Sequence, residues 1–546
     1  MRSLQVKSFD YIYLLKISFF LILTIYSLST MIYRNQTGND GDHWCHTPDQ
    51  DIFVVIEAMG HNSHILPKII DHPGYGHKLL YAYHFKLLNL LNISAYHKLE
   101  DFCQAHDPLE IWPVMIKNAR VLSFLLFIVF CLVMGLTCWQ LTGKPWTFPL
   151  GFYFCSIFPG GQYQSFIIRP ELIVSIMGCT GILFALVTLN TKRYWTFILF
   201  SILSGISVFL AIVTKIQGLP FLCFIVAIFL FFPINESKFF EHISAKKIFS
   251  PASGAVLSFL IVYGWTVWHK ITIHQNLPDN SRAMGLIIIV FCLLIFLSYF
   301  LRTRLGNNIS KRMLSFAYCL LGGFTGGIMF VYLSFLPFHS WHDSLDHCHA
   351  LLRLLTAPGE FTPYIKLDRL KILSFFYSSL LTWWNNYSFL LSSLMCFSLF
   401  FFFPKIITKH NKSIFILLIL ASYLYMTFTC LRYSVPHYLI FSDVFLILGF
   451  IYLFSKLSNL IGLKKVFQSC FIILIVAWMF LFSVFTPATY SSKSLSKIDL
   501  AVCIQWTYPS EESISWLHEQ YIQCIQRAYP TKINYIENLK NQSNFK

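Results

Sequence analysis

The sequence predicts an all-α polytopic membrane protein. Hydrophobic residues make up 56% of the 546-residue chain, charged residues make up only 12%, and the mean hydropathy is +0.60. A soluble domain carries about twice that charged fraction. Apolar runs of roughly 20 residues, each long enough to cross a bilayer, recur along almost the whole chain.

We predict about thirteen spans. The first run is of full span length and lacks the small-residue cleavage site of a signal peptide, so we expect it to be retained. The predicted spans are 12–33, 114–141, 147–166, 171–190, 194–213, 218–233, 252–269, 285–301, 313–333, 386–403, 413–431, 437–455 and 466–486.

The basic residues predict the orientation of these spans. Alternate connections hold nearly all the Lys and Arg clusters, such as 302–312 and 456–465, whereas the short loops between them hold few. By the positive-inside rule, the N-terminus is cytoplasmic and the C-terminus is exterior. The net charge of +16 therefore points to anionic membrane lipids as partners and not to nucleic acid.

This topology places three large segments on the exterior side, at about 34–113, about 334–385 and from about 487 onward. We accordingly divide the chain into a transmembrane domain, 1–486, that includes the first two of these loops, and an exterior C-terminal segment, 487–546. We expect the C-terminal segment to be a small folded cap with one helix.

The first exterior segment opens with the acidic stretch "HTPDQDIFVVIEAM", which contains Asp49, Asp51 and Glu57. Ile52–Met59 is a short helix candidate with Asp51 as its cap, and "DHPGYG" predicts a turn before an interfacial helix at 79–91. Such a carboxylate can act as a general base or hold a divalent cation. The alternative is that Asp49 and Asp51 only cap the helix.

Charged residues also stand at the exterior ends of later spans. They occur in "IIRPELIV", "IVTKIQGLPF" and "LRYSVPHYLIF". Arg offers a bidentate fork to phosphate and Lys a point charge, so converging cations would suit a phosphate group. A single cation at a span end is more often an interfacial anchor. The candidates are Arg169, Glu171, Lys215, Arg432, His437 and Tyr438.

These motifs resemble the GT-C superfamily of membrane glycosyltransferases, in particular protein O-mannosyltransferases and lipid A aminoarabinose transferases. "PDQD" stands where that family has an acidic pair, and "HPGYGHKLLY" is similar to its second motif. Asp49 matches the catalytic Asp of the family. Gln50 replaces the Glu that usually follows, and Asp51 is the candidate second carboxylate. The resemblance implies a GT-C-like fold with exterior loop helices.

The resemblance further implies an enzyme that moves a sugar from a polyprenyl-phosphate donor to a glycan, lipid or protein acceptor. Transfer would invert the anomeric centre, on the periplasmic or luminal side of a bacterial inner membrane or the endoplasmic reticulum. Asp49 would be the base, and the six residues at the span ends would form the donor phosphate site. Glu57, His72 and Tyr75 would position the acceptor.

A divalent metal ion is the one cofactor that the sequence raises. "FHSWHDSLDHCH" in the second exterior segment places His339, His342, Asp343 and Asp346 at helical spacing, which suits zinc. The alternative is a polar interfacial helix. In an oxidising compartment, the candidate disulfides are Cys45–Cys103 and Cys503–Cys524.

Two other classes of protein compete with the glycosyltransferase. A transporter or lipid flippase would explain many spans, but transporters often show internal repeats and none is visible here. An O-antigen ligase or polymerase would place its chemistry in 334–385, with His349 and Arg353 as candidates. Substitutions that abolish activity in the first but not in the second exterior segment would favour the glycosyltransferase over the O-antigen ligase or polymerase.

Overall fold

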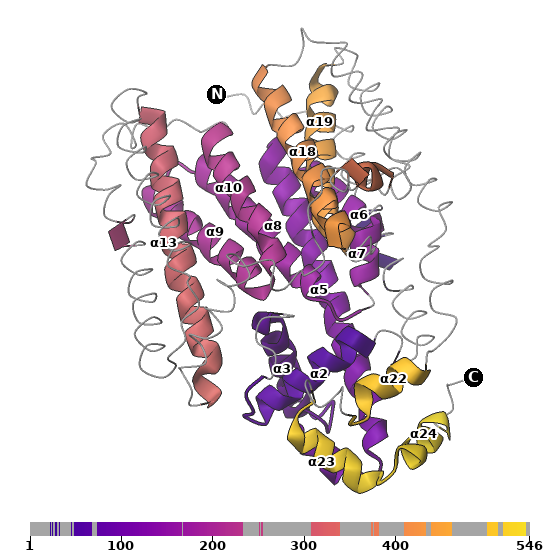
Figure 1. The fold of residues 1–546 in the computed structure, drawn as a ribbon. Helices are drawn as coiled ribbons and strands as arrows, with labels where there is room; N and C mark the ends of the chain where they lie inside the picture. Colours follow the sequence, from indigo (N-terminus) through magenta and orange to yellow (C-terminus); the bar gives the residue numbers. More distant parts are fainter. Residues whose placement is uncertain are drawn as a thin grey trace, which may run out of the picture. The chain divides into compact units, whose positions relative to one another are not determined.

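The computed structural model describes residues 45, 48–67, 74–165, 167–232, 307–338, 376–381, 409–432, 438–460, 500–510 and 517–541, with a few isolated positions within 22–32, 251–254 and 373–374. Every regular element in these ranges is a helix (Figure 1). The all-α prediction is confirmed for this part of the chain. The longer helices are α2 (Pro48–Asn62), α3 (Tyr75–Leu90), α5 (Ile111–Thr142), α6 (Thr147–Ile157), α8 (Pro170–Asn190), α9 (Tyr194–Thr214), α10 (Leu219–Phe231), α13 (Asn307–Phe335), α18 (Lys409–Arg432), α19 (Leu439–Leu460), α22 (Leu500–Thr507), α23 (Glu519–Ala528) and α24 (Lys532–Asn541).

Four helical stretches in the described part are long and apolar enough to cross a membrane. They are Pro108–Thr142, Pro170–Asn190, Tyr194–Thr214 and Leu439–Lys456. This supports a membrane protein, while the count of about thirteen spans remains a prediction. The spans predicted at 252–269, 285–301, 386–403 and 466–486 lie wholly or almost wholly outside the described residues.

The predicted span 147–166 is not one helix. Helix α6 ends at Ile157, and a short helix α7 (Pro159–Gln164) follows. Phe158 between them is extended, with φ −73° and ψ 144°. Because Pro159 disfavours a helical conformation in the residue before it, the proline explains the break.

The chain forms two compact units, which are described separately. Unit 1 comprises 1–38, 130–163 and 375–496, and unit 2 comprises 39–129, 164–374 and 497–546. In unit 1, helix α19 packs on α18 and α6. Phe154 of α6 meets Phe450 of α19 edge to face, and the Gly160 amide donates a 3.0 Å hydrogen bond to buried Asp443.

Unit 2 contains a layer of apolar helices in which α9 packs against both α8 and α13. The approach of α9 to α13 needs glycine. A Cβ on Gly205 would lie 1.7 Å from the Cys319 carbonyl oxygen, and one on Gly322 would lie 2.4 Å from the Ile202 carbonyl oxygen. Small residues at such contacts are typical of helices that pack within membranes.

Unit 2 also contains a hydrophobic core built from both ends of the chain. Phe102 of α4 (Asp101–Gln104), Trp112 of α5 and Tyr521 of α23 pack together with their ring centroids 4.8–5.7 Å apart. The C-terminal segment therefore folds onto the first predicted exterior segment. It has three described helices, α22, α23 and α24, so the prediction of one helix is wrong.

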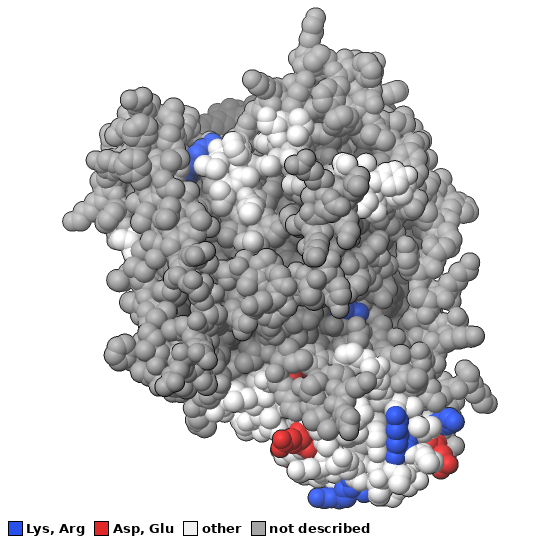
Figure 2. Space-filling view, in the orientation of Figure 1, with Lys and Arg blue, Asp and Glu red and all other residues white. Residues whose placement is uncertain are grey.

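Charge is distributed unevenly in the C-terminal segment. The exposed side chains include Glu519, Arg527, Lys532 and Lys540. Figure 2 shows that the described Lys, Arg, Asp and Glu visible on the face drawn gather mostly at the end where Figure 1 places α23 and α24. A charged outer surface over an apolar core is typical of a water-facing fold.

Two disulfides join the first predicted exterior segment to the C-terminal segment. Cys45 is bonded to Cys503 and Cys103 to Cys524, with Cα atoms 5.8 Å and 4.8 Å apart. The expected pairs Cys45–Cys103 and Cys503–Cys524 are therefore wrong. Because α22 packs on α2 and α23 on α4, thiols from opposite ends of the chain meet, and a pairing within each segment does not form.

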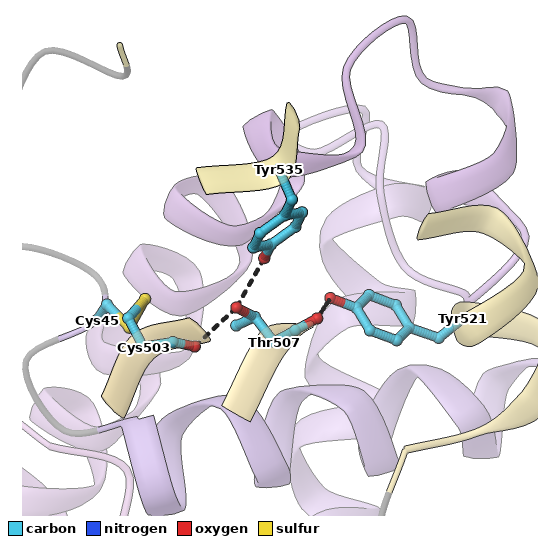
Figure 3. The surroundings of a disulfide bond; sticks show 5 residues. All are labelled: Cys45, Cys503, Thr507, Tyr521 and Tyr535. Carbon is cyan, nitrogen blue, oxygen red and sulfur yellow. Dashed lines mark hydrogen bonds between the residues drawn. A yellow bond between two sulfur atoms is a disulfide. The ribbon is translucent and has the colours of Figure 1, made fainter. Parts of the chain in front are cut away.

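Hydrogen bonds hold α22 to α23 and α24 beside the first disulfide (Figure 3). The Tyr521 hydroxyl donates to the Thr507 carbonyl at 2.6 Å, and the Tyr535 hydroxyl donates to the Thr507 hydroxyl oxygen at 2.7 Å. The Thr507 hydroxyl donates in turn to the Cys503 carbonyl at 2.7 Å. The three described helices of the C-terminal segment are thus connected through Thr507.

The disulfide pairing can be tested directly. Mass mapping of unreduced protein is expected to give cross-linked peptides that contain Cys45 with Cys503 and Cys103 with Cys524. Cys131 and Cys138, which are buried and unbonded in α5, serve as controls, because they should be alkylated once the protein is denatured without reductant. A Cys45–Cys103 peptide would contradict the structure.

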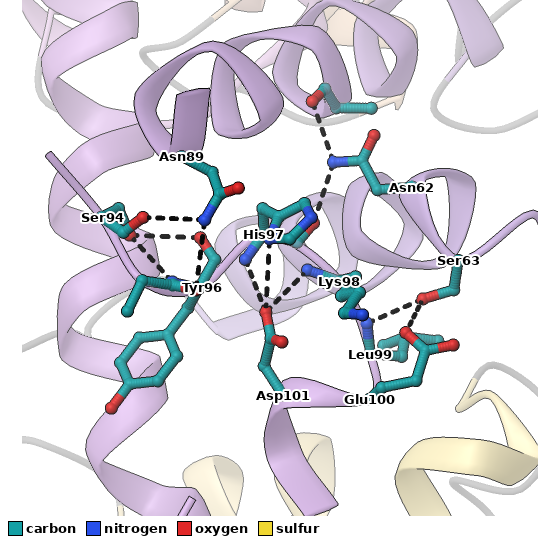
Figure 4. Close-up of polar contacts among 12 residues, drawn as sticks. Asn62, Ser63, Asn89, Ser94, Tyr96, His97, Lys98, Leu99, Glu100 and Asp101 are labelled. Carbon is teal, nitrogen blue, oxygen red and sulfur yellow. Dashed lines mark hydrogen bonds and ion pairs between the residues drawn. The ribbon is translucent and has the colours of Figure 1, made fainter. Parts of the chain in front are cut away.

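The loop after α3 is fixed onto the helices that precede it (Figure 4). The Asp101 carboxylate accepts hydrogen bonds from the amides of His97 at 2.7 Å and Lys98 at 3.0 Å. The Asn62 amide group donates to the carbonyls of Ala82 at 3.0 Å and His97 at 2.8 Å. Helices α2 and α3 and this loop are therefore held in one arrangement, which positions the polar residues described next.

Candidate functional site

The predicted acidic residue Asp51 is buried in unit 2. Its Oδ2 accepts hydrogen bonds from Arg120 Nε at 3.1 Å and Nη2 at 3.0 Å, and its Oδ1 accepts one from the Ile168 amide at 3.0 Å. Asp51 does not cap a helix starting at Ile52, because α2 already begins at Pro48. Its carboxylate instead connects α2, α5 and the residue before Arg169.

The predicted Arg-Pro-Glu motif begins helix α8. Arg169 is the extended N-cap residue, with φ −135° and ψ 137°, and Pro170 suits the first turn because its missing N–H needs no partner there. Glu171 is buried and forms an ion pair with Lys215, the residue that directly follows α9. Two of the predicted phosphate-site residues, Glu171 and Lys215, therefore contact each other.

The turn before α3 lies against the end of α9. Helix α3 begins at Tyr75, four residues before the expected start, because the extended residue Gly74 directly precedes it. A Cβ on Gly74 would lie 1.8 Å from the Thr214 carbonyl oxygen, so only glycine fits. Residues 74–78 of the "HPGYGHK" motif are thereby placed at the end of α9, next to Lys215.

His77, the third residue of α3, lies among these charged groups. Its side chain is completely buried, and neither ring nitrogen has a hydrogen-bond partner in the described part of the chain. Its ring meets that of Tyr81 edge to face at 4.8 Å. Burial lowers the pKa of His77 to about 3, while Glu171 acts to raise it and Lys78, Lys215 and Arg169 act to lower it. The imidazole is thus neutral near pH 7.

Lys78, the residue after His77, belongs to a second set of buried polar side chains. Lys78 is completely buried, and its Nζ is 3.7 Å from Glu57 Oε2 and 4.5 Å from the centre of the Phe53 ring. His518 of the C-terminal segment places its Nε2 3.7 Å from Glu57 Oε1. The Glu57 carboxylate therefore faces a cation from α3 on one side and an imidazole from the tail on the other.

The structure thus brings together part of the predicted site. We call the buried polar side chains around His77 the polar cluster. It contains five predicted site residues of unit 2, which are Asp51, Glu57, Arg169, Glu171 and Lys215, together with Lys78. Asp49 lies in the first turn of α2 and Tyr75 at the start of α3, as the backbone shows. His72 and His437 lie outside the described residues. Arg432 ends α18, and Tyr438 precedes α19, both in unit 1.

The predicted metal site is not tested. His339, His342, Asp343 and Asp346 lie outside the described residues. Within the described ranges, there is no group of three or more His, Cys, Asp or Glu side chains that could hold a metal ion.

Sequence reasoning missed four members of this region: His77, Lys78, Arg120 and His518. Arg120 did carry a signal, since it is a charge inside a predicted apolar span and such charges usually have partners. Lys78 and His77 were within a quoted motif without being assigned a role. Nothing local in the sequence indicates that His518 reaches Glu57, because they are more than 400 positions apart.

Comparison with known proteins does not identify a function for this site. No family model, no curated protein and no solved structure matches the chain significantly. Any functional assignment must therefore come from the polar cluster and from the sequence motifs.

The burial of His77 predicts a pH-dependent stability. Its folded pKa of about 3 is below its ordinary value of 6.5, so its contribution is fully present above pH 6.5 and is lost as the pH falls towards 3. We expect a loss of about 1.4 kcal/mol per pH unit in this range. His61, whose pKa burial lowers to about 4, acts in the same direction.

Unfolding of the purified protein in detergent between pH 5 and 8 measures this dependence. His77→Leu should remove the His77 share of the slope below pH 6.5, about 1.4 kcal/mol per pH unit, and leave the slope from His61 and other groups. An unchanged slope in His77→Leu would show that the imidazole can be protonated without cost.

Proposed function

We propose that the protein is an integral-membrane glycosyltransferase that uses a polyprenyl-phosphate sugar as donor. The observation that carries this proposal is the polar cluster. Three motifs that are far apart in sequence, and that were predicted separately as parts of one site, contribute to a single buried region of unit 2. They are "PDQD", through Asp51, "HPGYGHK", and the span-end pair Arg169 and Lys215.

The charges in this region favour an anion as ligand. Arg169, Lys215 and Lys78 all act on His77, and Glu171 is the carboxylate among the described residues that acts on it. The gathering of three cationic side chains suits a phosphate, whose oxygens accept a bidentate pair of hydrogen bonds from an arginine. The neutral His77 has one ring N–H, which can donate to a phosphate or sugar oxygen once the ligand is bound.

The carboxylates divide into two roles in this proposal. Both oxygens of Asp51 accept hydrogen bonds from the protein, so Asp51 holds α2 against Ile168 and Arg120. Asp49 keeps the role of general base. It takes the proton of the acceptor hydroxyl while the acceptor oxygen bonds to the anomeric carbon and the bond to the phosphate oxygen breaks.

The cations stabilise the negative charge that develops on the departing polyprenyl phosphate. Displacement in a single step inverts the anomeric configuration. The isoprenoid chain lies among the apolar helices. Two disulfides join the first predicted exterior segment to the C-terminal segment. This supports placing both segments on the exterior side of the membrane, in an oxidising compartment.

Turnover of lipid-linked sugars tests the proposal. Purified protein is incubated in detergent with a panel of radiolabelled polyprenyl-phosphate sugars and with glycan, lipid and peptide acceptors. We expect transfer from at least one donor, with inversion of the anomeric centre, and binding of that donor without acceptor. Absence of both binding and transfer across the panel would refute the proposed function.

A further inference from the structure

The C-terminal segment contributes a side chain to the polar cluster. His518 is 2% exposed and faces Glu57 Oε1 at 3.7 Å, while Lys78 faces Oε2 of the same carboxylate at the same distance. Glu57 and Lys78 are themselves buried. A buried charge is costly unless a partner fixes it, so the position of each group depends on the others.

The backbone around His518 is held firmly. His518 is the N-cap residue of α23, and its carbonyl accepts a 3.0 Å hydrogen bond from the Ile522 amide. Cys524 of the same helix is bonded to Cys103. The imidazole also packs on α2 at Gly60, where a Cβ would lie 2.9 Å from His518 Nε2.

Lys78 links this contact to the rest of the cluster. It follows His77 directly in α3, and its charge acts on the His77 imidazole together with those of Arg169, Lys215 and Glu171. The lysine stem is long, and several rotamers would otherwise compete. A carboxylate held from its other side by His518 restricts the ammonium to one place.

We propose that His518 is a positioning residue: through Glu57 it fixes the Lys78 ammonium in the polar cluster, and thereby sets the affinity of the site for a lipid-linked phosphate. The C-terminal segment is then a part of the site and not only a cap over it. The identity of the ligand rests on the proposed function, whereas the coupling of His518 to Lys78 does not.

Binding of polyprenyl phosphate to the full-length protein in detergent tests the effect on the ligand. His518→Leu is expected to raise the Kd about tenfold. His518→Gln, whose amide keeps a polar N–H group that can face Glu57, should stay within about threefold of the wild type. Glu57→Gln should weaken binding as His518→Leu does, and the double variant should bind no more weakly than the weaker single variant. Glu519→Gln, an exposed neighbour on α23, is the matched control and should leave the Kd unchanged.

Thermal unfolding of the same proteins tests the coupling without any ligand. The variant with both His518→Leu and Lys78→Met is expected to lose more in Tm than the two single variants together, because only the double variant leaves the buried Glu57 carboxylate facing neither side chain. Additive losses would overturn the coupling.

The remaining outcomes also decide the matter. A wild-type Kd in His518→Leu, or an equal loss in His518→Gln and His518→Leu, would overturn the positioning role, since only the shape of the side chain would then matter. If the wild type binds no polyprenyl phosphate while the Tm coupling is present, then the proposed function fails and the coupling stands.

Discussion

Replacing Arg120 by leucine is expected to destabilise the protein by about 3–5 kcal/mol, because it leaves a buried carboxylate without its cation. Asp51 is 0% exposed, and its Oδ2 accepts both of its recorded side-chain hydrogen bonds from Arg120. The interior cannot solvate the remaining charge. Unfolding of the purified variant in detergent, followed by circular dichroism, measures the loss.

Two further variants show that the ion pair causes this loss. Lys117→Leu removes an exposed cation from the same helix and should change the unfolding free energy by less than about 0.5 kcal/mol. Asp51→Leu combined with Arg120→Leu should be more stable than Arg120→Leu alone, since the carboxylate of this pair is then no longer buried without its partner. A double variant less stable than Arg120→Leu would contradict this account.

The sequence predicts the helices well where composition alone determines them. The described helices α5, α8, α9, α10, α13, α18 and α19 each lie over a predicted span, because length and hydropathy are sufficient signals. The predictions fail where a single residue or a contact between distant parts of the sequence determines the structure. Pro159 splits a predicted span, and packing of the C-terminal segment against α2 and α4 determines both the disulfides and the number of its helices.

The candidate site shows the same division. Span-end charges such as Arg169 and Lys215 stand out because charge is expensive near the membrane. Their partners do not stand out, since pairing is a property of three-dimensional proximity. The ion pair of Lys215 with Glu171 and the approach of His518 to Glu57 could be recognised only after the helices had been placed.

The same distinction separates the two acidic residues of "PDQD". Asp51 has three recorded hydrogen bonds that hold it in the protein, which suits a structural carboxylate. Asp49 precedes it by two residues in the first turn of α2 and carries the resemblance to the catalytic Asp. The proposal therefore assigns stability to one residue and chemistry to the other.

Replacing Asp49 by asparagine is accordingly expected to lower kcat by about 10²–10⁴-fold, the usual contribution of a general base, with donor binding and Tm unchanged. The amide is similar in shape to the carboxylate but cannot take the proton of the acceptor hydroxyl. Asp51→Asn should show the opposite pattern, with a lower Tm and a much smaller loss of kcat per folded molecule. Single-turnover assays with saturating donor, run beside thermal unfolding, separate the two. Wild-type turnover in Asp49→Asn would remove Asp49 as the base, and a large loss of kcat in Asp51→Asn at full Tm would transfer that role to Asp51.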